Sequence, residues 1–536
     1  MVDFSKGQIR RRNSYEELNF DTDHKHKTKL DLIRLSAIVC GIEFCYAAET
    51  AFVSPILLQL GLPIIFMTWI WCLPPLFGFF LVPVLGSLSD KCQTRIGRRR
   101  PFIILYSIGI LLGLLLVSNV GRRIGQWFGD IKDPSSNTTE LFNETFIESY
   151  PFISHKFGTM ITILGVVLLD LDCDACQSPS RAYLLDVTNV NQHSSGLTTF
   201  TSMAGLGGGL GYFLGGIPWE KTFLTRLLGD QIHVLFTLVW IIFIICMLLT
   251  ITAAKEPTTT AIMASNLSRS VSRQFLISSH HSSMDIIEEI DQYERTVVKP
   301  RDRYASISSN HIKISCIDYL RSIIHMPSSL KWLCLTNFFC WMSLVSYSLF
   351  FTDFVGQAVF GGNPRYESNH PLRVLYNDGV RFGSWSMSIY SISCSIYSLN
   401  IQKLNDYFGI KRVYIGSQLI YAVGMLLMGY LRHRIGVILL SAASGILYST
   451  LFTIPFLLIS KYYASNTYGE SNIHGQVRGI GTDVAIVSSM VFLAQLCLSS
   501  TMGIFIHLAG STVIITIIAS LLSICGAISA TQVSYL

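Results

Sequence analysis

The sequence predicts an all-helical membrane protein whose twelve spanning helices form two halves of six. Three observations predict this class. Half of the residues are hydrophobic and 14% are charged, whereas soluble proteins carry roughly a quarter charged residues. About twelve segments contain the roughly 20 mainly apolar residues that a spanning helix needs. A short motif of acidic, glycine and basic residues also occurs in both halves, which is typical of a duplicated bundle.

The expected helices divide evenly between the two halves of the chain. In the first half they are 35–59, 65–88, 101–120, 158–178, 196–217 and 233–254. In the second half they are 330–353, 383–401, 412–431, 435–459, 480–501 and 509–530. These segments should be helical because the backbone in hydrocarbon must satisfy its own hydrogen bonds.

Polar segments flank and separate the two bundles. We expect a tail at 1–34, a first bundle at 35–254, a linker at 255–328 and a second bundle at 329–536. The basic tail and the linker place both termini in the cytosol, although the short loops carry equal numbers of basic residues on both sides. We expect no cleavable signal peptide, and we expect the Ser-rich linker to be disordered. Serines after basic residues are candidate phosphorylation sites: Ser14, Ser272 and Ser306.

The loop after the third predicted span, about 121–157, should face away from the cytosol. It contains two glycosylation sequons, at Asn137 and Asn143. A third sequon at Asn266 lies in the predicted cytosolic linker, and we expect it to stay unmodified. No cysteine falls in a predicted outer loop, so we expect no structural disulfide.

Two motifs inside spans are best explained by packing. Gly207, Gly211 and Gly215 recur every four residues, which forms a flat stripe that another helix can approach. A dinucleotide loop is excluded because no strand precedes this segment. Cys173 and Cys176 form a C-x-x-C motif, but free cysteine packs as a small apolar residue.

Ionisable residues inside spans are costly and usually functional. The candidates for binding protons or substrate are Glu43, Glu49, Asp170, Asp174, Arg181 and Asp353. At about 100° per residue, Asp170 and Asp174 share one helix face with Arg181, whereas Asp172 points nearly opposite. A carboxylate in a low-dielectric site takes up a proton more readily, and a nearby arginine opposes this. This face therefore suits proton coupling, and the alternative is a structural ion pair.

Aromatic residues in spans either line a sugar site or belong to packing and interfacial belts. Among them we select Trp385, because Ser384, Ser386 and Ser388 surround it in the sequence. An enzyme is not expected, since no nucleophile–base pair, metal-ligand set or phosphate loop lies in a suitable context.

The repeated motif suits a gate between two moving halves. Its first copy is Asp90, Gly97, Arg98, Arg99 and Arg100, and its second is Asp406, Gly409, Lys411 and Arg412. An acid and guanidinium groups can bridge neighbouring helix ends in one state and release them in another. The alternative is that the positive charges only fix topology.

Five segments together resemble the animal proton-associated sugar transporters. This is solute carrier family 45, which includes the membrane-associated transporter protein and is related to the plant sucrose–proton symporters. The segments are 41–50, 97–101, 177–182, 352–357 and 478–483. The resemblance covers nearly all spans but not the tail, the linker or the outer loop. It implies the major facilitator fold and proton-coupled symport of sucrose or related sugars, with protons as coupling ion and no cofactor.

The resemblance also implies roles for particular residues. In the plant branch, an acid in span four and an arginine eleven residues later are critical, and they match Asp170 and Arg181. An acid in span seven matches Asp353. The chain departs from the plant pattern at Glu43 and Glu49, where plant transporters have glutamine. It departs again after Gly356, where Gln357-Ala358 replaces Arg-Glu.

The expected function is therefore sugar–proton symport by alternating access, with sugar, protons and the lipid bilayer as partners. We expect no nucleic-acid partner, and a monomer by default. The expected membrane is the plasma membrane, with an intracellular vesicle or lysosome-related membrane as the alternative. Two other functions stay open: a non-transporting sugar sensor or scaffold, and an organelle transporter that chiefly alters lumenal pH.

Overall fold

Every segment predicted to span the membrane in the first half contains a helix. The computed structural model describes residues 27–59, 64–120, 156–256, 326–464 and 480–535, except 93, 95, 216, 218–222, 224–230, 365 and 367–369. The first-half helices are α3 Ala37–Gln59, α4 Ile64–Lys91, α5 Arg100–Leu115, α7 Lys156–Val187, α8 His193–Gly215 and α10 Gln231–Ala253. A short helix, α2 Lys29–Leu35, precedes α3, and its capping residue Thr28 accepts a hydrogen bond from the backbone of Asp31. A π-helical turn η1 Leu116–Val120 extends α5, and a 3₁₀ turn η3 Val190–Gln192 precedes α8.

The second half repeats this pattern. Its helices are α15 Ser328–Phe354, extended by the π-helical turn η5 Val355–Val359, then α16 Pro371–Phe408, α17 Ile410–Leu431, α18 Arg434–Ala464, α19 Ile480–Ser488, α20 Met490–Ala509 and α21 Ile514–Ala530. The segment predicted at 480–501 is two helices with a break at Ser489. Helix α16 begins at Pro371, well before its predicted start at residue 383. The apolar criterion missed the first turns of this helix because they are polar. His370 caps this start by accepting from the backbone of Leu372, and Pro371 suits the first turn.

Several predicted features lie outside the described residues. They are the sequons at Asn137, Asn143 and Asn266, the candidate phosphorylation sites at Ser14, Ser272 and Ser306, and most of the tail, outer loop and linker. The helical bundle, Lys25–Glu256 with Pro327–Leu536, is one compact unit. We call its end with the α4–α5 loop the predicted cytosolic end.

The hydropathy of the helices separates two groups. By length and composition, seven helical segments among the described residues are apolar enough to cross a membrane. Helices α7, α8 and α16 are long but fall outside that set. They carry buried acids, or many glycine, serine and threonine residues. Polar side chains therefore concentrate on the helices that meet inside the bundle, as expected when polar groups avoid lipid.

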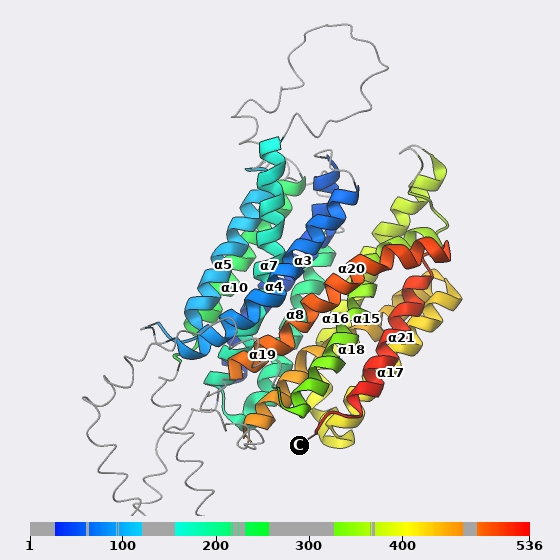
Figure 1. Ribbon diagram of the computed structural model, residues 1–536. Coiled ribbons are helices and arrows are strands. Elements are labelled where there is room, and N and C mark those ends of the chain that lie inside the picture. The colour runs from blue at the N-terminus through cyan, green and yellow to red at the C-terminus, as the bar shows by residue number, and fades with distance from the viewer. Residues whose placement is uncertain are drawn as a thin grey trace, which may run out of the picture. The chain divides into compact units, whose positions relative to one another are not determined.

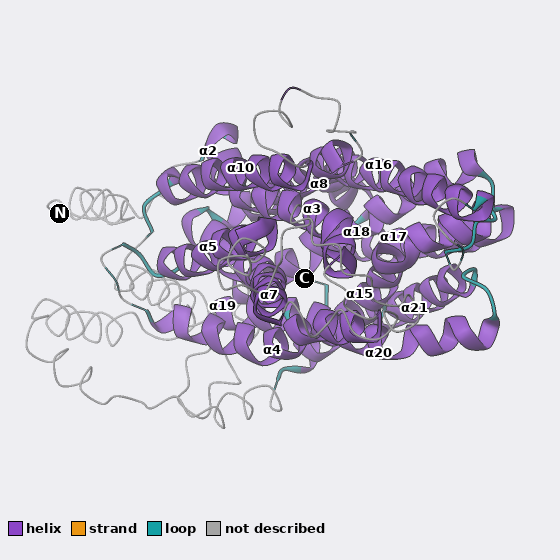
Figure 2. Ribbon diagram, turned by 90° about the horizontal axis from the view of Figure 1, so that it is seen from above, coloured by secondary structure: helices purple, strands orange, loops and turns teal. Residues whose placement is uncertain are grey.

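Helix α8 packs between α3 of its own half and α16 of the other half. Figures 1 and 2 show α8 alongside these helices. A Cβ atom at Gly207 would collide with the backbone carbonyl of Cys40 in α3, and one at Gly205 would lie 2.5 Å from the carbonyl oxygen of Ser391 in α16. Gly207 of the predicted stripe thus permits close approach of α3, and Gly205, which lies outside the stripe, permits close approach of α16.

Replacing Gly207 by alanine is expected to lower thermal stability, because the added methyl group meets backbone that cannot move alone. Overpacking of this kind typically costs about 1–3 kcal/mol. The matched control is Gly503→Ala in α20, where a Cβ meets no atom of the described residues within 4 Å. This control should be neutral or stabilising by up to about 1 kcal/mol. Melting of the purified proteins in detergent measures both, and equal melting temperatures would contradict the prediction.

Candidate functional site

Four carboxylates gather between α3 and α7, and we call them the acidic cluster: Glu43, Glu49, Asp170 and Asp174. Glu49 and Asp170 are 1% and 5% exposed. Both carboxylate oxygens of Glu49 and Oδ2 of Asp170 have no hydrogen-bond partner among the described residues. Asp174 accepts a hydrogen bond from the hydroxyl of Tyr46 in α3. Buried carboxylates without partners are costly when ionised, so Glu49 and Asp170 are suited to bind a proton or a ligand donor.

Arg181 links the acidic cluster to the other half of the molecule. Its guanidinium group is buried, and Nη2 donates to Oε1 of Gln177 at 2.8 Å. Its central carbon lies 4.4 Å and 4.3 Å from the ring centroids of Phe452 and Phe456 in α18. A cation over desolvated rings in this way is stabilised by the ring quadrupole.

The side chains of α7 point in the directions that their spacing along the helix predicts. Glu49 and Asp174 are the charged neighbours of Asp170, while Glu43 and Asp174 are those of Arg181. No ion pair among the described residues joins Asp170 to Arg181. Asp172 instead points at Gly109 of α5.

The second half contributes four rings that face this region, and we call them the aromatic wall: Trp341, Tyr390, Tyr448 and Phe452. The ring of Tyr448 lies 5.5 Å from that of Tyr390 and 4.2 Å from that of Phe452, and Trp341 packs edge-on against Tyr448 at 6.2 Å. The hydroxyl of Tyr448 donates to Oε1 of Glu43 at 2.6 Å. Aromatic faces beside carboxylate acceptors suit a ligand with both C–H faces and hydroxyl groups.

Sequence reasoning did not single out Tyr448 or Phe452. A usable signal was present, since Ser444, Ser449 and Thr450 place polar groups around Tyr448 inside a predicted span. Trp385, which was selected instead, is 46% exposed and packs edge-on against Phe213 of α8 at 5.6 Å. Its described ring contact is therefore with α8 rather than with the aromatic wall.

Asp353 is the second-last residue of α15, and the π-helical turn η5 begins two residues later. Its carboxylate accepts a hydrogen bond from the hydroxyl of Tyr376 in α16. This described contact is internal to the second half. The structure thus brings together Glu43, Glu49, Asp170, Asp174 and Arg181, and places Asp353 and Trp385 in other contacts.

Asp90 joins the two halves at the predicted cytosolic end. Its carboxylate accepts from the backbone nitrogens of Gly481 at 3.2 Å and Thr482 at 2.8 Å, and from the Thr482 hydroxyl at 2.7 Å. These are first-turn amides of α19, and the N-terminus of a helix favours an anion. The first copy of the repeated motif therefore bridges the halves.

Arg99 holds Asp90 in this position. It is fully buried and forms ion pairs with Asp90 and with Oδ2 of Asp186, the latter at 2.9 Å. Burial disfavours the charged guanidinium, but the carboxylates of Asp186 and Asp90 raise the pKa of Arg99 above its ordinary value. Arg98 also contacts Asp186, at 2.6 Å.

Glu256 fixes the backbone of the first copy. Its carboxylate accepts the backbone N–H groups of Arg98, Arg99 and Arg100 at 2.5, 2.8 and 2.9 Å. Gly97 has a φ of +136°, and a Cβ there would lie 2.6 Å from the Glu256 carboxylate. Glycine is therefore required for both conformation and space.

The second copy is anchored in a similar way but does not reach the other half in the described structure. Lys411 donates to the backbone oxygen of Thr531 at 3.3 Å and lies 5.8 Å from the ring centroid of Tyr535. Each copy is thus tied to the end of the last helix of its own half. Asp406 and Arg412 are exposed. Among the described contacts, the gate is therefore asymmetric.

A seam of hydrogen bonds between the halves accompanies the gate. We define the seam as residues 195–202 of α8 with 394–400 of α16. The hydroxyls of Ser398 and Ser395 donate to the backbone oxygens of Thr198 and Ser202, each at 2.6 Å. Figure 1 shows the helices of the two halves spreading apart from the end that carries α19. The predicted cytosolic end is thus closed.

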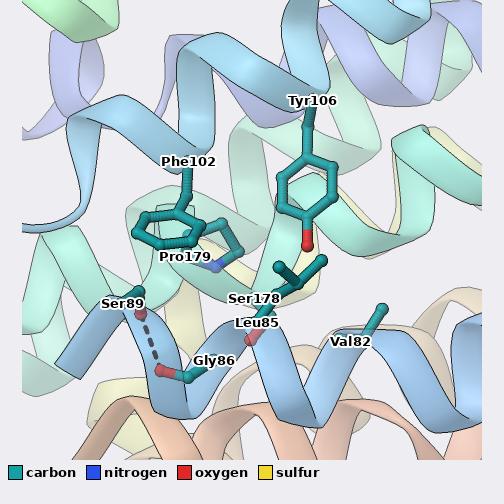
Figure 3. A pocket seen from close by; sticks show the side chains of 8 residues that line it. All are labelled: Val82, Leu85, Gly86, Ser89, Phe102, Tyr106, Ser178 and Pro179. Carbon is teal, nitrogen blue, oxygen red and sulfur yellow. Dashed lines mark hydrogen bonds between the residues drawn. The ribbon is translucent and has the colours of Figure 1, made fainter. Parts of the chain in front are cut away.

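A small pocket lies within the first half, between α4, α5 and α7 (Figure 3). Its lining residues are Val82, Leu85, Gly86, Ser89, Phe102, Tyr106, Ser178 and Pro179. Its volume of ≈ 10 Å³ has room for about one water molecule. The pocket is too small for a sugar and lies away from the aromatic wall.

Comparison with known proteins shows what this chain is similar to. Residues 37–121 match the family model described as MFS/sugar transport protein. The chain is 33% identical to the membrane-associated transporter protein of Mus musculus over 92% of the chain and 91% of that protein. It is 30% identical to solute carrier family 45 member 3 of Homo sapiens over 86% of the chain and 76% of that protein. It is 28% identical to proton-associated sugar transporter A of Homo sapiens, over 95% and 87%.

Solved structures share the fold. The proton:xylose symporter XylE bound to 6-bromo-6-deoxy-D-glucose matches with a TM-score of 0.57 and 13% identity, over 94% of this chain and 96% of the other. The human organic anion transporter MFSD10 matches with a TM-score of 0.53 and 13% identity, over 95% and 100%. At such low sequence identity, these similarities support the helix arrangement only and give no information about ligands. The predicted two-halved fold is confirmed.

Proposed function

Because the chain belongs to solute carrier family 45, a family of sugar and proton transporters in the major facilitator superfamily, we propose that it is a secondary active symporter. It moves sucrose or a related small sugar together with protons by alternating access. One observation supports this most directly. The acidic cluster of the first half includes the buried, unpartnered carboxylates of Glu49 and Asp170, and it meets the aromatic wall of the second half through the hydrogen bond from Tyr448 to Glu43.

The residues of the site take distinct roles in this proposal. Asp170 is the leading proton acceptor, because it is buried and its described charged neighbours are other carboxylates. Glu49, also without a described partner, binds sugar hydroxyls or a second proton. Arg181 limits the negative charge near Glu43 and Asp174. Protons are the coupling ion, and no cofactor takes part.

The gate contacts explain how the conformation changes in this mechanism. Asp90 binds the start of α19 while the predicted cytosolic end is closed. Opening that end must break these bonds and those of the seam, so the halves alternate between two contact sets. The protein is a multi-pass membrane protein. We place it in the plasma membrane as a monomer, with both termini in the cytosol.

Uptake by the purified protein in proteoliposomes is the decisive test. Radiolabelled sucrose, glucose, fructose and mannitol are offered at an acidic and at a neutral external pH. At least one sugar should accumulate at acidic pH, and collapsing the proton gradient should abolish the accumulation. Transport of no sugar would favour the sensor or scaffold function, and movement of protons without sugar would favour a role in lumenal pH.

A further inference from the structure

We infer that Tyr448 is a coupling residue whose hydrogen bond to Glu43 keeps the halves joined until a hydroxyl group of the substrate replaces it. The inference rests on the proposed function and specifies how the site senses its ligand. It gives Tyr448 and Glu43 a task separate from proton transfer at Asp170.

The bond crosses between the two halves at the acidic cluster. Glu43 lies on α3 and Tyr448 on α18, and the two residues are 9% and 7% exposed. Glu43 is the member of the cluster with a described hydrogen bond to the other half. Asp174 is bound within the first half, by Tyr46. A ligand that binds the carboxylate of Glu43 can therefore alter the contact between the two halves.

Neighbouring contacts connect the Tyr448–Glu43 bond to the predicted cytosolic end, so loss of the bond can affect that end. A Cβ at Gly208 would lie 3.9 Å from Cβ of Glu43 and 3.1 Å from Oγ of Ser391 in α16. Five residues further along α18, Thr453 shares a hydrogen bond with Thr201 of α8 at 2.8 Å. The bond between Glu43 and Tyr448 thus joins the acidic cluster to α18, which itself contacts the seam through Thr453.

A sugar hydroxyl can replace the Tyr448 hydroxyl as the hydrogen-bond donor to Glu43. A carboxylate or carboxylic acid oxygen accepts a hydrogen bond from either a phenol or a sugar hydroxyl. The exchange changes the free energy of the site little, because one hydrogen bond replaces another. It nevertheless removes a bond that joins the halves, so the bound ligand shifts the population toward separation. The remaining charged neighbours of Glu43 are Asp174 and Arg181 of α7.

This mechanism sets a chemical requirement on the substrate. The ligand must stack on the aromatic wall and present an O–H donor to Glu43. A deoxy analogue without that donor should bind and compete, yet leave Tyr448 on Glu43 and the seam closed. Binding and triggering are then separable properties of a ligand.

The test is hydrogen exchange of the full-length protein in lipid nanodiscs, followed at the seam. Tyr448→Phe keeps the ring and removes the donor. Without sugar, this variant should raise exchange at the seam about fivefold, the change expected from losing one hydrogen bond. The transported sugar should raise exchange in the wild type and add little in the variant. Glu43→Met removes the acceptor and should give the same result, and the double variant should exceed neither.

Tyr421→Phe is the matched control. It also removes one phenol hydrogen bond, from Tyr421 to the backbone oxygen of Ser343 at 3.1 Å, but both residues belong to the second half. It should leave exchange at the seam at the wild-type level. The inference is overturned if Tyr448→Phe and Glu43→Met both exchange like the wild type there.

The readout also separates this inference from the proposed function. Raised exchange in the variants supports the coupling role even if no sugar is transported, in which case the substrate class alone is wrong. Sugar transport with unchanged exchange in both variants refutes the coupling role and retains the symporter. If Tyr448→Phe does not fold, Glu43→Met tests the same bond from the other partner.

Discussion

Replacing Asp170 by asparagine is expected to abolish acid-stimulated sugar accumulation while the protein still reaches the membrane. Asparagine has nearly the same size as aspartate but cannot bind and release a proton. A pH difference of one unit supplies about 1.4 kcal/mol per proton, which supports roughly tenfold accumulation. The variant should lose this factor and show equal uptake at acidic and neutral pH. Sugar exchange without a gradient should persist, because it needs no net proton movement.

Asp172→Asn is the matched control for this prediction. It makes the same change on the same helix, but Asp172 points at Gly109 of α5 and away from the acidic cluster. It should retain acid stimulation. Unchanged acid stimulation in Asp170→Asn would remove Asp170 from proton coupling, and a loss in both variants would indicate damage to α7 instead.

Replacing Arg99 by glutamine is expected to give the largest loss of stability. Arg99 is fully buried and neutralises Asp90 and Asp186, so its removal leaves two carboxylates without this cation. Removing one partner from a buried ion pair typically costs about 3–5 kcal/mol. The purified variant should melt at a clearly lower temperature. Its predicted cytosolic end should also open more often, because Asp90 is no longer held against α19.

Arg412→Gln provides the control for Arg99. Arg412 occupies the matching place in the second copy of the motif but is exposed. Exposed charges contribute little to stability, so this variant should melt within about 0.5 kcal/mol of the wild type. Equal melting of the two variants would show that Arg99 does not stabilise the gate.

The expected and observed helices show which structural features can be predicted from runs of apolar residues. Each predicted span contains a helix, since a run of apolar residues in a bilayer has few other structures available. The same criterion misplaced the start of α16 and missed the break at Ser489. Both differences arise where a proline or a polar turn sets the geometry and hydropathy carries no signal.

The candidate site was predictable for the acids and much less so for their partners. An acid inside a span is conspicuous because hydrocarbon disfavours it, so Glu43, Glu49 and Asp170 stood out. An aromatic residue inside a span is ordinary, so Tyr448 did not, and Trp385 was the aromatic residue selected. Glu256 was also overlooked, since a carboxylate at the edge of a linker looks solvated until the backbone amides of residues 98–100 are seen to surround it.

The sequence by itself determined the class of this protein: a two-halved helical bundle with acids hidden from lipid and a duplicated motif. It could do so because the bilayer constrains composition along each helix, one segment at a time. Only the tertiary structure decided which half supplies the partner of each group. Tyr448 meets Glu43, and Asp90 meets α19, across 405 and 392 residues of chain. Packing between the halves sets such distant pairings, and no local pattern encodes them.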